Sequence, residues 1–201
     1  MAARGRPRSF DRDIALRRAM EVFWSKGYEG TQLADLTAAI GIAPPSFYAA
    51  FGSKEAAFRE AVDLYIATIG SGPMKALDEA PSLRAAITGV LRGSIDVALS
   101  NDAAGCFLIL GVVNCLSETA AARDYLRAAR RTTVDLLRAR LQRGVEAGEL
   151  PPGADPDKLA AFFHGIMQAI SFQARDGATR ADLEALIEPA VSALPLRKQP
   201  A

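Results

Sequence analysis

Three arginines near the start of the chain are its first candidates for binding chemistry. Arg4, Arg6 and Arg8 stand within the first ten residues, which contain no acidic residue. A guanidinium group binds phosphate oxygens, and a short basic arm can follow a phosphate backbone or enter a DNA groove. A solvated terminus without a partner is the alternative, and the arm alone does not decide between the two.

The segment 31–51 predicts the helix-turn-helix that such an arm would accompany. Its first part has apolar residues at i, i+3 and i+7, which indicates a short helix with one buried stripe. Gly41 follows, and glycine readily adopts the left-handed conformation that ends many helices. Pro45 then suits the first position of a second short helix, where no N–H donor is needed. In proteins that bind DNA, this arrangement places the second helix in the major groove.

The second short helix presents different residues on its two faces. Phe47 and Phe51 are four residues apart and face inward, which turns Pro45, Tyr48 and Ala49 outward. A helix with a tyrosine and short side chains on its outer face fits a DNA groove.

Amphipathic helices on both sides are expected to hold this motif in place. One ends at Gly27, and Ser53 caps the other, while Thr31 is expected to cap the first helix of the motif. The large side chains of the resulting small core are Phe23, Trp24, Phe47 and Phe51.

Several short segments of the first third of the chain occur in a fixed order. They are Gly-Arg-Pro-Arg at 5–8, Phe-Trp-Ser-Lys-Gly-Tyr at 23–28, Thr-Gln-Leu-Ala-Asp-Leu at 31–36, Gly-Ile-Ala-Pro-Pro-Ser-Phe-Tyr at 41–48 and Phe-Gly-Ser-Lys-Glu at 51–55. This order resembles the TetR family of bacterial transcriptional regulators.

The resemblance implies an N-terminal DNA-binding domain, a helical C-terminal domain that binds a ligand, and a homodimer. We place the first domain at 1–53 and the second at 54–201, and the helix that starts the second domain joins the two. Phosphate contacts carry over to Thr31, Tyr48 and Lys54, whose hydroxyl, phenol and ammonium groups can each bind a phosphate oxygen. A helix cap for Thr31 and core packing for Tyr48 are the alternatives.

The second helix of the motif has an unusual composition for a helix that reads bases. Between Pro44 and Phe51 it contains no Arg, Lys, Asn or Gln, the side chains that make paired hydrogen bonds to base edges. Its exposed candidates are Pro44, Pro45, Ser46 and Ala49. We expect contacts to thymine methyl groups, a hydrogen bond from Ser46 and the arginine arm to supply most of the specificity.

Composition and helical spacing predict an all-α fold of about nine helices. Half of the 201 residues are hydrophobic and the net charge is +1, so bulk charge does not announce a nucleic-acid partner. The longest uncharged run, 103–116, is too short for a bilayer and predicts a buried helix. No apolar segment follows the N-terminal arginines as in a signal peptide, so we expect a cytoplasmic protein with no membrane partner.

The sequence offers little for catalysis or metal binding. No Cys/His spacing suits zinc, and no glycine-rich phosphate loop or nucleophile elbow occurs, so we expect no catalytic residue, metal or cofactor. His164, the single histidine, lies in an apolar helix where packing is its commoner role. Cys106 and Cys115 point to opposite sides of the predicted helix 103–116 and are expected to act as small buried hydrophobes, with a redox-sensing thiol as the alternative.

The C-terminal half is expected to bind a small, neutral or aromatic molecule in an apolar cavity between helices. Cys106, Asn114 and His164 supply the polarity near its apolar runs. The predicted ligand-binding residues are Tyr65, Phe107, Leu110, Asn114, Tyr125, Met167 and Gln168. The helix 117–146 carries many arginines among acids, which indicates a solvated face rather than a second nucleic-acid surface. These arginines are Arg123, Arg127, Arg130, Arg131, Arg138, Arg140 and Arg143.

The last two predicted helices, 155–177 and 179–194, are strongly apolar and are expected to form a two-fold, four-helix dimer interface. Pro189 is expected to kink the second of them. The predicted interface residues are Phe162, Gly165, Ile166, Ala169, Phe172, Leu183, Leu186, Ile187 and Val191.

The predicted function is a ligand-responsive transcriptional regulator, most simply a repressor that a small molecule releases from a palindromic operator. The alternative is a helical small-molecule-binding or catalytic protein that does not bind DNA.

Overall fold

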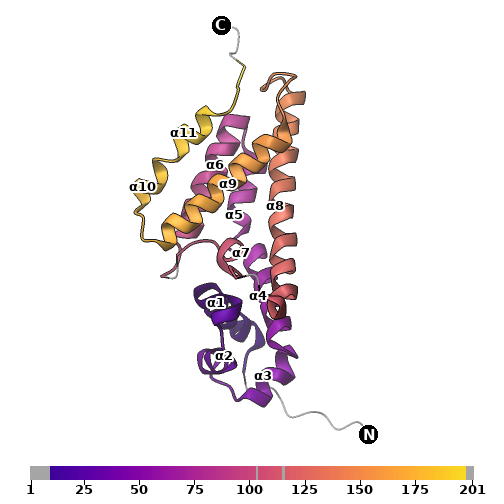
Figure 1. Cartoon of the computed structure of the whole chain (residues 1–201), viewed down its shortest axis with the longest axis vertical. Coiled ribbons are helices and arrows are strands. Elements are labelled where there is room, and N and C mark those ends of the chain that lie inside the picture. The colour runs from indigo at the N-terminus through magenta and orange to yellow at the C-terminus, as the bar shows by residue number, and fades with distance from the viewer. Residues whose placement is uncertain (1–9, 103, 115, 198–201) are drawn as a thin grey trace.

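Eleven α-helices and one 3-10 turn make up the regular structure of the chain in a computed structural model, which describes residues 10–102, 104–114 and 116–197 (Figure 1). No strand occurs among these residues, and the predicted all-α fold is confirmed. The helices are α1 (Arg12–Gly30), α2 (Leu33–Ile40), α3 (Pro44–Phe51), α4 (Lys54–Ala67), α5 (Ser71–Glu79), α6 (Leu83–Ala98), α7 (Phe107–Leu110), α8 (Ala120–Glu146), α9 (Pro156–Arg175), α10 (Arg180–Glu184) and α11 (Ile187–Ser192), and the 3-10 turn η1 spans Ser117–Thr119.

Side-chain caps set the starts of several helices where the sequence predicts them. Ser53 accepts a hydrogen bond from the Ala56 amide at the start of α4, and Asp155 accepts from two amides at the start of α9. Thr179 and Asp182 form the expected capping box at α10. These local interactions satisfy backbone donors that the first turn of a helix leaves without partners.

Two hydrophobic clusters divide the elongated molecule. The first joins α1–α4 around Phe23, Trp24, Phe47 and Phe58, and it continues into α7 through the fully buried Phe107. The second cluster joins α5, α6, α8, α9, α10 and α11. Figure 1 shows α7 between the two groups and α8 running along the C-terminal group down to α4. The predicted domain boundary at residue 54 stays a prediction. In the structure, α4 packs mainly with the first cluster.

The predicted buried helix 103–116 is much shorter in the structure. It is reduced to the single turn of α7, because Ala104 and Gly105 have φ angles of +51° and +78° and helical hydrogen bonding cannot pass through them. The expected placement of Cys106 and Cys115 on one helix therefore fails for Cys106, which precedes α7. Cys115 lies outside the described residues.

Two further differences concern prolines. The glycine and proline residues of the run 70–73 predict a break after the helix that Ser53 caps, but Pro73 lies in the first turn of α5, where a missing N–H costs nothing. Pro189 does not kink the predicted helix 179–194. That segment is divided into α10 and α11, and the division places Pro189 in the first turn of α11.

The segment 104–111 makes contacts that hold the two clusters together. The Trp24 indole N–H donates to the Gly105 carbonyl at 2.8 Å, and the Tyr28 amide donates to the Gly111 carbonyl at 2.7 Å, so α1 is attached at both ends of the segment. From α9, the Ser171 hydroxyl oxygen accepts from the Cys106 amide at 2.6 Å. From α8, Arg130 donates to the Leu108 carbonyl.

Candidate nucleic-acid interface and ligand pocket

The predicted helix-turn-helix is formed by α2, a turn at Gly41 and α3. Gly41 has a φ of +80° and closes α2 in the left-handed conformation, as expected. In α3 the Phe47 side chain is fully buried, whereas Tyr48 is 50% exposed on the opposite face. Pro44 and Pro45 occupy the first turn of α3, so the helix begins without the donors that would otherwise need partners.

The outer face of α3 is exposed and uncharged. Pro44, Pro45, Tyr48 and Ala49 are exposed there, and Ser46 is half-buried. Apart from Tyr48, the side chains of this face are short, so the backbone of α3 can approach the floor of a groove closely. Arg4, Arg6 and Arg8 lie outside the described residues, and every DNA contact named here stays a prediction.

Thr31 does not have the role that the sequence predicts. The residue that caps α2 is Gln32, whose backbone N–H donates to the Asp35 carboxylate at 2.8 Å. The Thr31 side chain is fully buried, and its hydroxyl donates to the Gly27 carbonyl at 2.6 Å. Because this hydroxyl is inside the core and already bonded, we withdraw Thr31 from the predicted phosphate contacts.

Lys54 is the first residue of α4, three residues after the end of α3. Its Nζ atom is 4.4 Å from the centroid of the Tyr28 ring, which holds the stem against α1. Burial lowers the pKa of the Lys54 ammonium, and Glu29 and Asp35 oppose that change. Two other cations near the motif are neutralised in ion pairs, Lys26 with Asp35 and Arg12 with Glu60.

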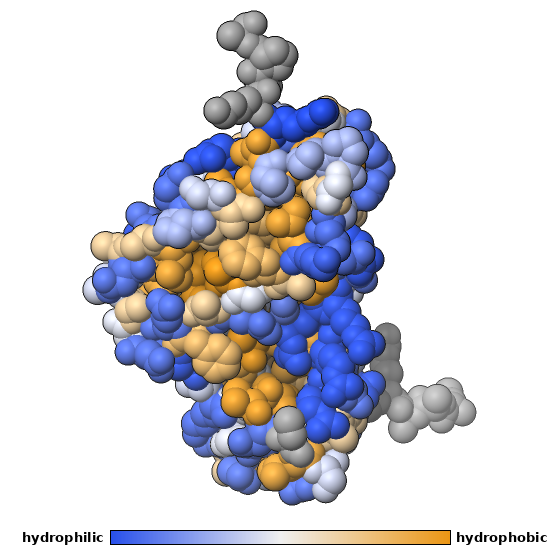
Figure 2. Space-filling view, turned by 45° about the horizontal axis from the view of Figure 1, so that its top comes forward, coloured by the Kyte–Doolittle hydropathy of each residue, from blue (hydrophilic) through white to orange (hydrophobic). Residues whose placement is uncertain are grey.

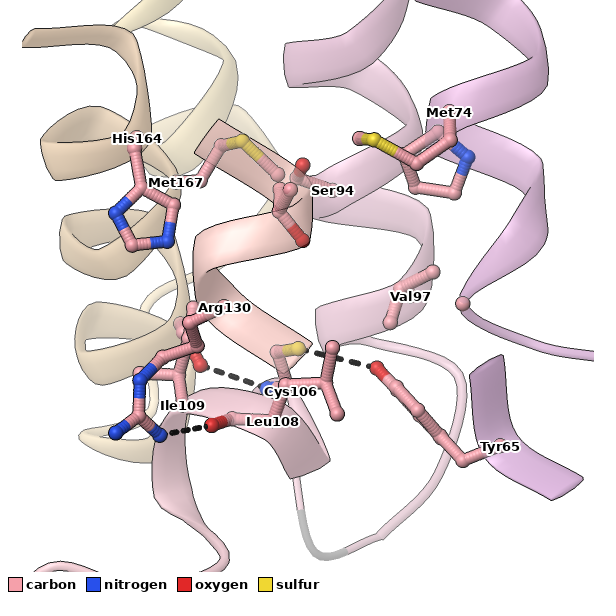
Figure 3. A pocket seen from close by; sticks show the side chains of 14 residues that line it. Tyr65, Met74, Ser94, Val97, Cys106, Leu108, Ile109, Arg130, His164 and Met167 are labelled. Atoms are coloured by element: carbon pink, nitrogen blue, oxygen red, sulfur yellow. Dashed lines mark hydrogen bonds between the residues drawn. The ribbon is translucent and has the colours of Figure 1, made fainter. Parts of the chain in front are cut away.

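A cavity opens between α4, α5, α6, the segment containing α7, α8 and α9 (Figure 3). The centre of a water-sized sphere can occupy about 60 Å³ of it, and the cavity is partly open to solvent. Arg130 and His164 lie on one side of it, and Met74 and Val97 on the other. Most of the wall is apolar, as expected for a site that binds a small molecule between helices.

The polar groups of the cavity are neutral, with one exception. The Tyr65 hydroxyl donates to Cys106 Sγ at 3.1 Å, and burial raises the pKa of both groups, so both keep their protons at neutral pH. Burial, with the Arg130 charge as a smaller cause, lowers the pKa of His164 and favours the neutral imidazole. Arg130 remains charged and donates to the Leu108 carbonyl.

Two of the predicted ligand-binding residues, Tyr65 and Met167, line this cavity. The other predicted residues do not, which corrects the list. Phe107 and Leu110 are buried in the packing around α7, and Asn114 is exposed because no helix continues to it. The remaining two are Tyr125, whose hydroxyl donates to Asp63 on α4, and Gln168, which is one helical step from the α9 face that lines the cavity.

The predicted dimer residues fall into two groups. Leu183, Ile187 and Val191 are buried in the core of this chain, because α10 and α11 use their apolar faces to cover α6 and α9. This removes them from the predicted interface. Phe162 and Phe172 on α9 are 42% and 47% exposed, and hydrophobic surface gathers over the C-terminal helices in Figure 2. The other four are partly buried: Gly165, Ile166, Ala169 and Leu186.

Comparisons with known proteins agree with this architecture. The family model "Bacterial regulatory proteins, tetR family" matches residues 15–61, and "Tetracyclin repressor-like, C-terminal domain" matches residues 80–188. The chain is 36% identical to the HTH-type transcriptional repressor ComR of Escherichia coli (strain K12), over 96% of this chain and 92% of that protein.

The chain belongs to the TetR family. It is a helix-turn-helix transcriptional regulator. Among solved structures, the TetR family regulator CifR, as a cysteine mutant complexed with 26 bp double-strand operator DNA, is 43% identical with a TM-score of 0.90, covering 95% of this chain and 100% of that one. A putative TetR regulator from Rhodococcus sp. RHA1 is 33% identical with a TM-score of 0.63, covering 92% and 99%.

Sequence patterns missed most of the cavity wall of this TetR-family chain. Met74 belongs to α5, a helix that these patterns do not predict, and Ser171 lies one turn beyond the predicted ligand residues of α9. Arg130 was predicted on a solvated face. Arg130 is three residues from Thr133, which also lines the cavity, so the two share one face of α8. This spacing does not reveal which other helix packs over that face. Arg140 is also buried, beside Glu149. No helix in the described parts of the chain has both the length and the apolar character to cross a membrane.

The lowered pKa of His164 predicts a pH dependence of stability. An unfolded chain takes up a proton on this histidine near its ordinary pKa of about 6.5, whereas the folded chain does so at lower pH. The unfolded state therefore binds more protons in the window just below about pH 6.5, and the free energy of unfolding falls as the pH falls through it. The His164→Gln variant lacks this contribution. Because the chain has one histidine, urea unfolding of both proteins at about pH 7.5 and about pH 5.5 isolates it. An equal loss of stability in the two proteins would contradict the prediction.

Proposed function

We propose that this TetR-family regulator is a repressor that binds a palindromic operator as a homodimer and leaves it when a small molecule fills the cavity. It acts by binding and not by catalysis, in the cytoplasm where its operator is. The name of ComR as a repressor and the operator complex of CifR support the proposal. The observation that carries it is that α4 touches both the cavity and α3, while the segment 104–111 touches both the cavity and α1, the helix on which α2 packs.

The DNA surface of the proposed repressor consists of the outer face of α3 and the start of α4. Tyr48 and Lys54 would bind phosphate oxygens and fix the register of the protein on the duplex. The short side chains of Pro44, Pro45 and Ala49 would contact thymine methyl groups, and Ser46 would donate or accept a hydrogen bond at a base edge. The arginine arm would add contacts in the neighbouring minor groove.

The proposed dimer interface uses the exposed side of α9 together with α8. Phe162 and Phe172 are the large exposed apolar side chains of α9, and Leu136 of α8 is 45% exposed. Gly165 and Ala169 lie between the two phenylalanines, and a Cβ atom added to Gly165 would meet nothing within 4 Å. This open strip lets a second copy of α9 approach closely, so the two-fold bundle consists of α8 and α9 from each subunit.

Two connections would transmit ligand binding to the reading helix. The first is α4, with Lys54 at its DNA end and Tyr65 in the cavity wall. The second is the segment 104–111, which contributes Cys106, Leu108 and Ile109 to the cavity and holds α1 through its flanking carbonyls.

The phosphate role of Lys54 predicts a change in salt dependence. The Lys54→Ala variant should bind all DNA sequences more weakly, and the slope of log K against log salt concentration should become less steep by about one unit, because one counterion fewer is released. The matched control is Lys75→Ala, which removes an exposed lysine of α5. Fluorescence anisotropy with the DNA flanking the gene measures both slopes. An unchanged slope for Lys54→Ala would place this lysine outside the interface, and no binding by the wild type would refute the repressor.

The open strip on α9 predicts the effect of a bulky charge there. Gly165→Arg should abolish dimerisation and tight operator binding together, while the subunit stays folded because a Cβ atom at this position meets nothing within 4 Å. Light scattering and circular dichroism measure the two properties. Gly153→Arg adds the same side chain in the loop before α9, also in open space, and should remain a dimer. A dimer that persists in Gly165→Arg would locate the interface elsewhere.

The coupling through α1 predicts a spectroscopic signal. Trp24 is the single tryptophan of the chain, is 2% exposed, and packs against Tyr65 with ring centroids 5.0 Å apart. Operator DNA that shifts α1 relative to the segment 104–111 should change its emission without touching it. DNA of the same length and scrambled sequence, at equal concentration, is the control. Identical emission with both DNAs at saturation would show that this connection does not respond to the operator.

A further inference from the structure

Arg130 is the single formally charged side chain among the described residues that line the cavity, and no aspartate or glutamate is among them. A guanidinium has five N–H donors, and the one acceptor on the protein for Arg130 is the Leu108 carbonyl. Neighbouring arginines of α8 are neutralised in ion pairs, for example Arg127 with Asp124 and Arg138 with Asp135. Arg130 has no such ion pair in the described part of the chain.

The position of Arg130 in the cavity wall changes the ionisation of its own guanidinium group. Burial lowers the pKa of Arg130, which means that the charged form has lost part of its hydration. A half-buried cation that has lost water and faces no carboxylate is stabilised by any anion that enters beside it. His164, held neutral on the same side of the cavity, offers a further hydrogen bond.

The opposite side of the cavity is apolar. Met74 and Val97 lie there, and the apolar Met167 and Ile109 flank His164 and Arg130 on the near side. A ligand that satisfies both sides has one acidic head and a short apolar body. A neutral ligand leaves the guanidinium without an anion, and a polyanion brings more negative charge than one arginine neutralises.

We propose that the cavity selects small organic monocarboxylates, with the carboxylate bound by the Arg130 guanidinium and the apolar part against Met74 and Val97. This inference rests on the proposed function of the cavity as the effector site. It replaces the sequence-based prediction of a small, neutral or aromatic ligand, and with it the separate prediction that Arg130 belongs to a solvated face.

The same residue gives the carboxylate a route to the DNA-binding domain. In the absence of ligand the guanidinium donates to the Leu108 carbonyl through Nη1. A carboxylate that engages the remaining N–H groups would draw the guanidinium toward itself and away from that carbonyl. Release of Leu108 frees the middle of a segment whose two ends, at Gly105 and Gly111, are bonded to α1. Charge recognition and displacement of α1 then follow from one exchange of hydrogen bonds.

The test compares acids with their uncharged amides of nearly equal shape. Benzoate is paired with benzamide, and hexanoate with hexanamide, in calorimetric titrations of the full-length dimer. At least one acid should bind at least about tenfold more tightly than its amide, since a hydrogen-bonded charge contributes on that order. Arg130→Met should weaken binding of that acid by about tenfold or more and leave the amide unchanged. Arg131→Met, which removes an exposed arginine at the next position of α8, should behave as the wild type.

Several results would overturn the proposal. They are equal affinity for acid and amide, undiminished acid binding by Arg130→Met, and no binding of either acid. A purely structural role of Arg130 would weaken acid and amide alike, so the difference between them is the deciding quantity. Arg130→Lys keeps the charge but not the fork of donors, and it should retain part of the preference for the acid even if Arg130→Met proves unstable.

Operator release distinguishes this proposal from the function on which it rests. Anisotropy of labelled operator DNA is followed during the same titrations. Amides that bind as tightly as the acids and release the operator would refute selection of carboxylates and leave the repressor function intact. Acids that bind through Arg130 while the operator stays bound at saturation would support the selection and refute effector-driven release.

Discussion

The segment 104–111 cannot provide partners for all of its own backbone N–H and C=O groups, and the helices around it supply the missing ones. The left-handed residues before α7 limit the helix to one turn, so carbonyls and amides on both sides need partners from elsewhere. They find them on α1, α8 and α9, through Trp24, Arg130 and Ser171. A segment that is bonded to three helices in this way also forms a wall of the cavity, so it cannot shift without moving its partners.

The two proposed sites are close because one helix serves both. Lys54 and Tyr65 on α4 are separated by about 16 Å along the helix axis at 1.5 Å per residue. The hydrogen bond from Tyr125 to Asp63 attaches the same helix to α8, and it raises the pKa of Tyr125 to about 12. The proposed dimer bundle also contains α8. The hydrogen bond therefore attaches α4 to the dimer interface, and the dimer sets the distance between the two reading heads.

Local sequence signals predicted what local physics decides. The left-handed Gly41, the caps at Ser53 and Asp155 and the buried Phe47 depend on neighbours within a turn or two, and the structure confirms them. The signals failed where distant groups decide. The sequence predicts Leu183 as an interface residue, but the packing of α10 on the core buries it. Thr31 is a local exception, because the Gly27 carbonyl that accepts from its hydroxyl is four residues away.

The position of Arg130 shows why cavities are harder to predict than helices. A helical period places Arg130, Arg127 and Arg131 within one turn of α8, but it does not reveal that the segment 104–111 and α9 cover one edge of that turn. Arg127 and Arg131 stay exposed there, whereas Arg130 has lost part of its water. Arginine is thus hydrated at two positions of this turn and partly desolvated at a third. A ligand can bias the two states of the protein only by as much as it binds them differently, and a guanidinium that holds Leu108 in one state and a carboxylate in the other supplies such a difference.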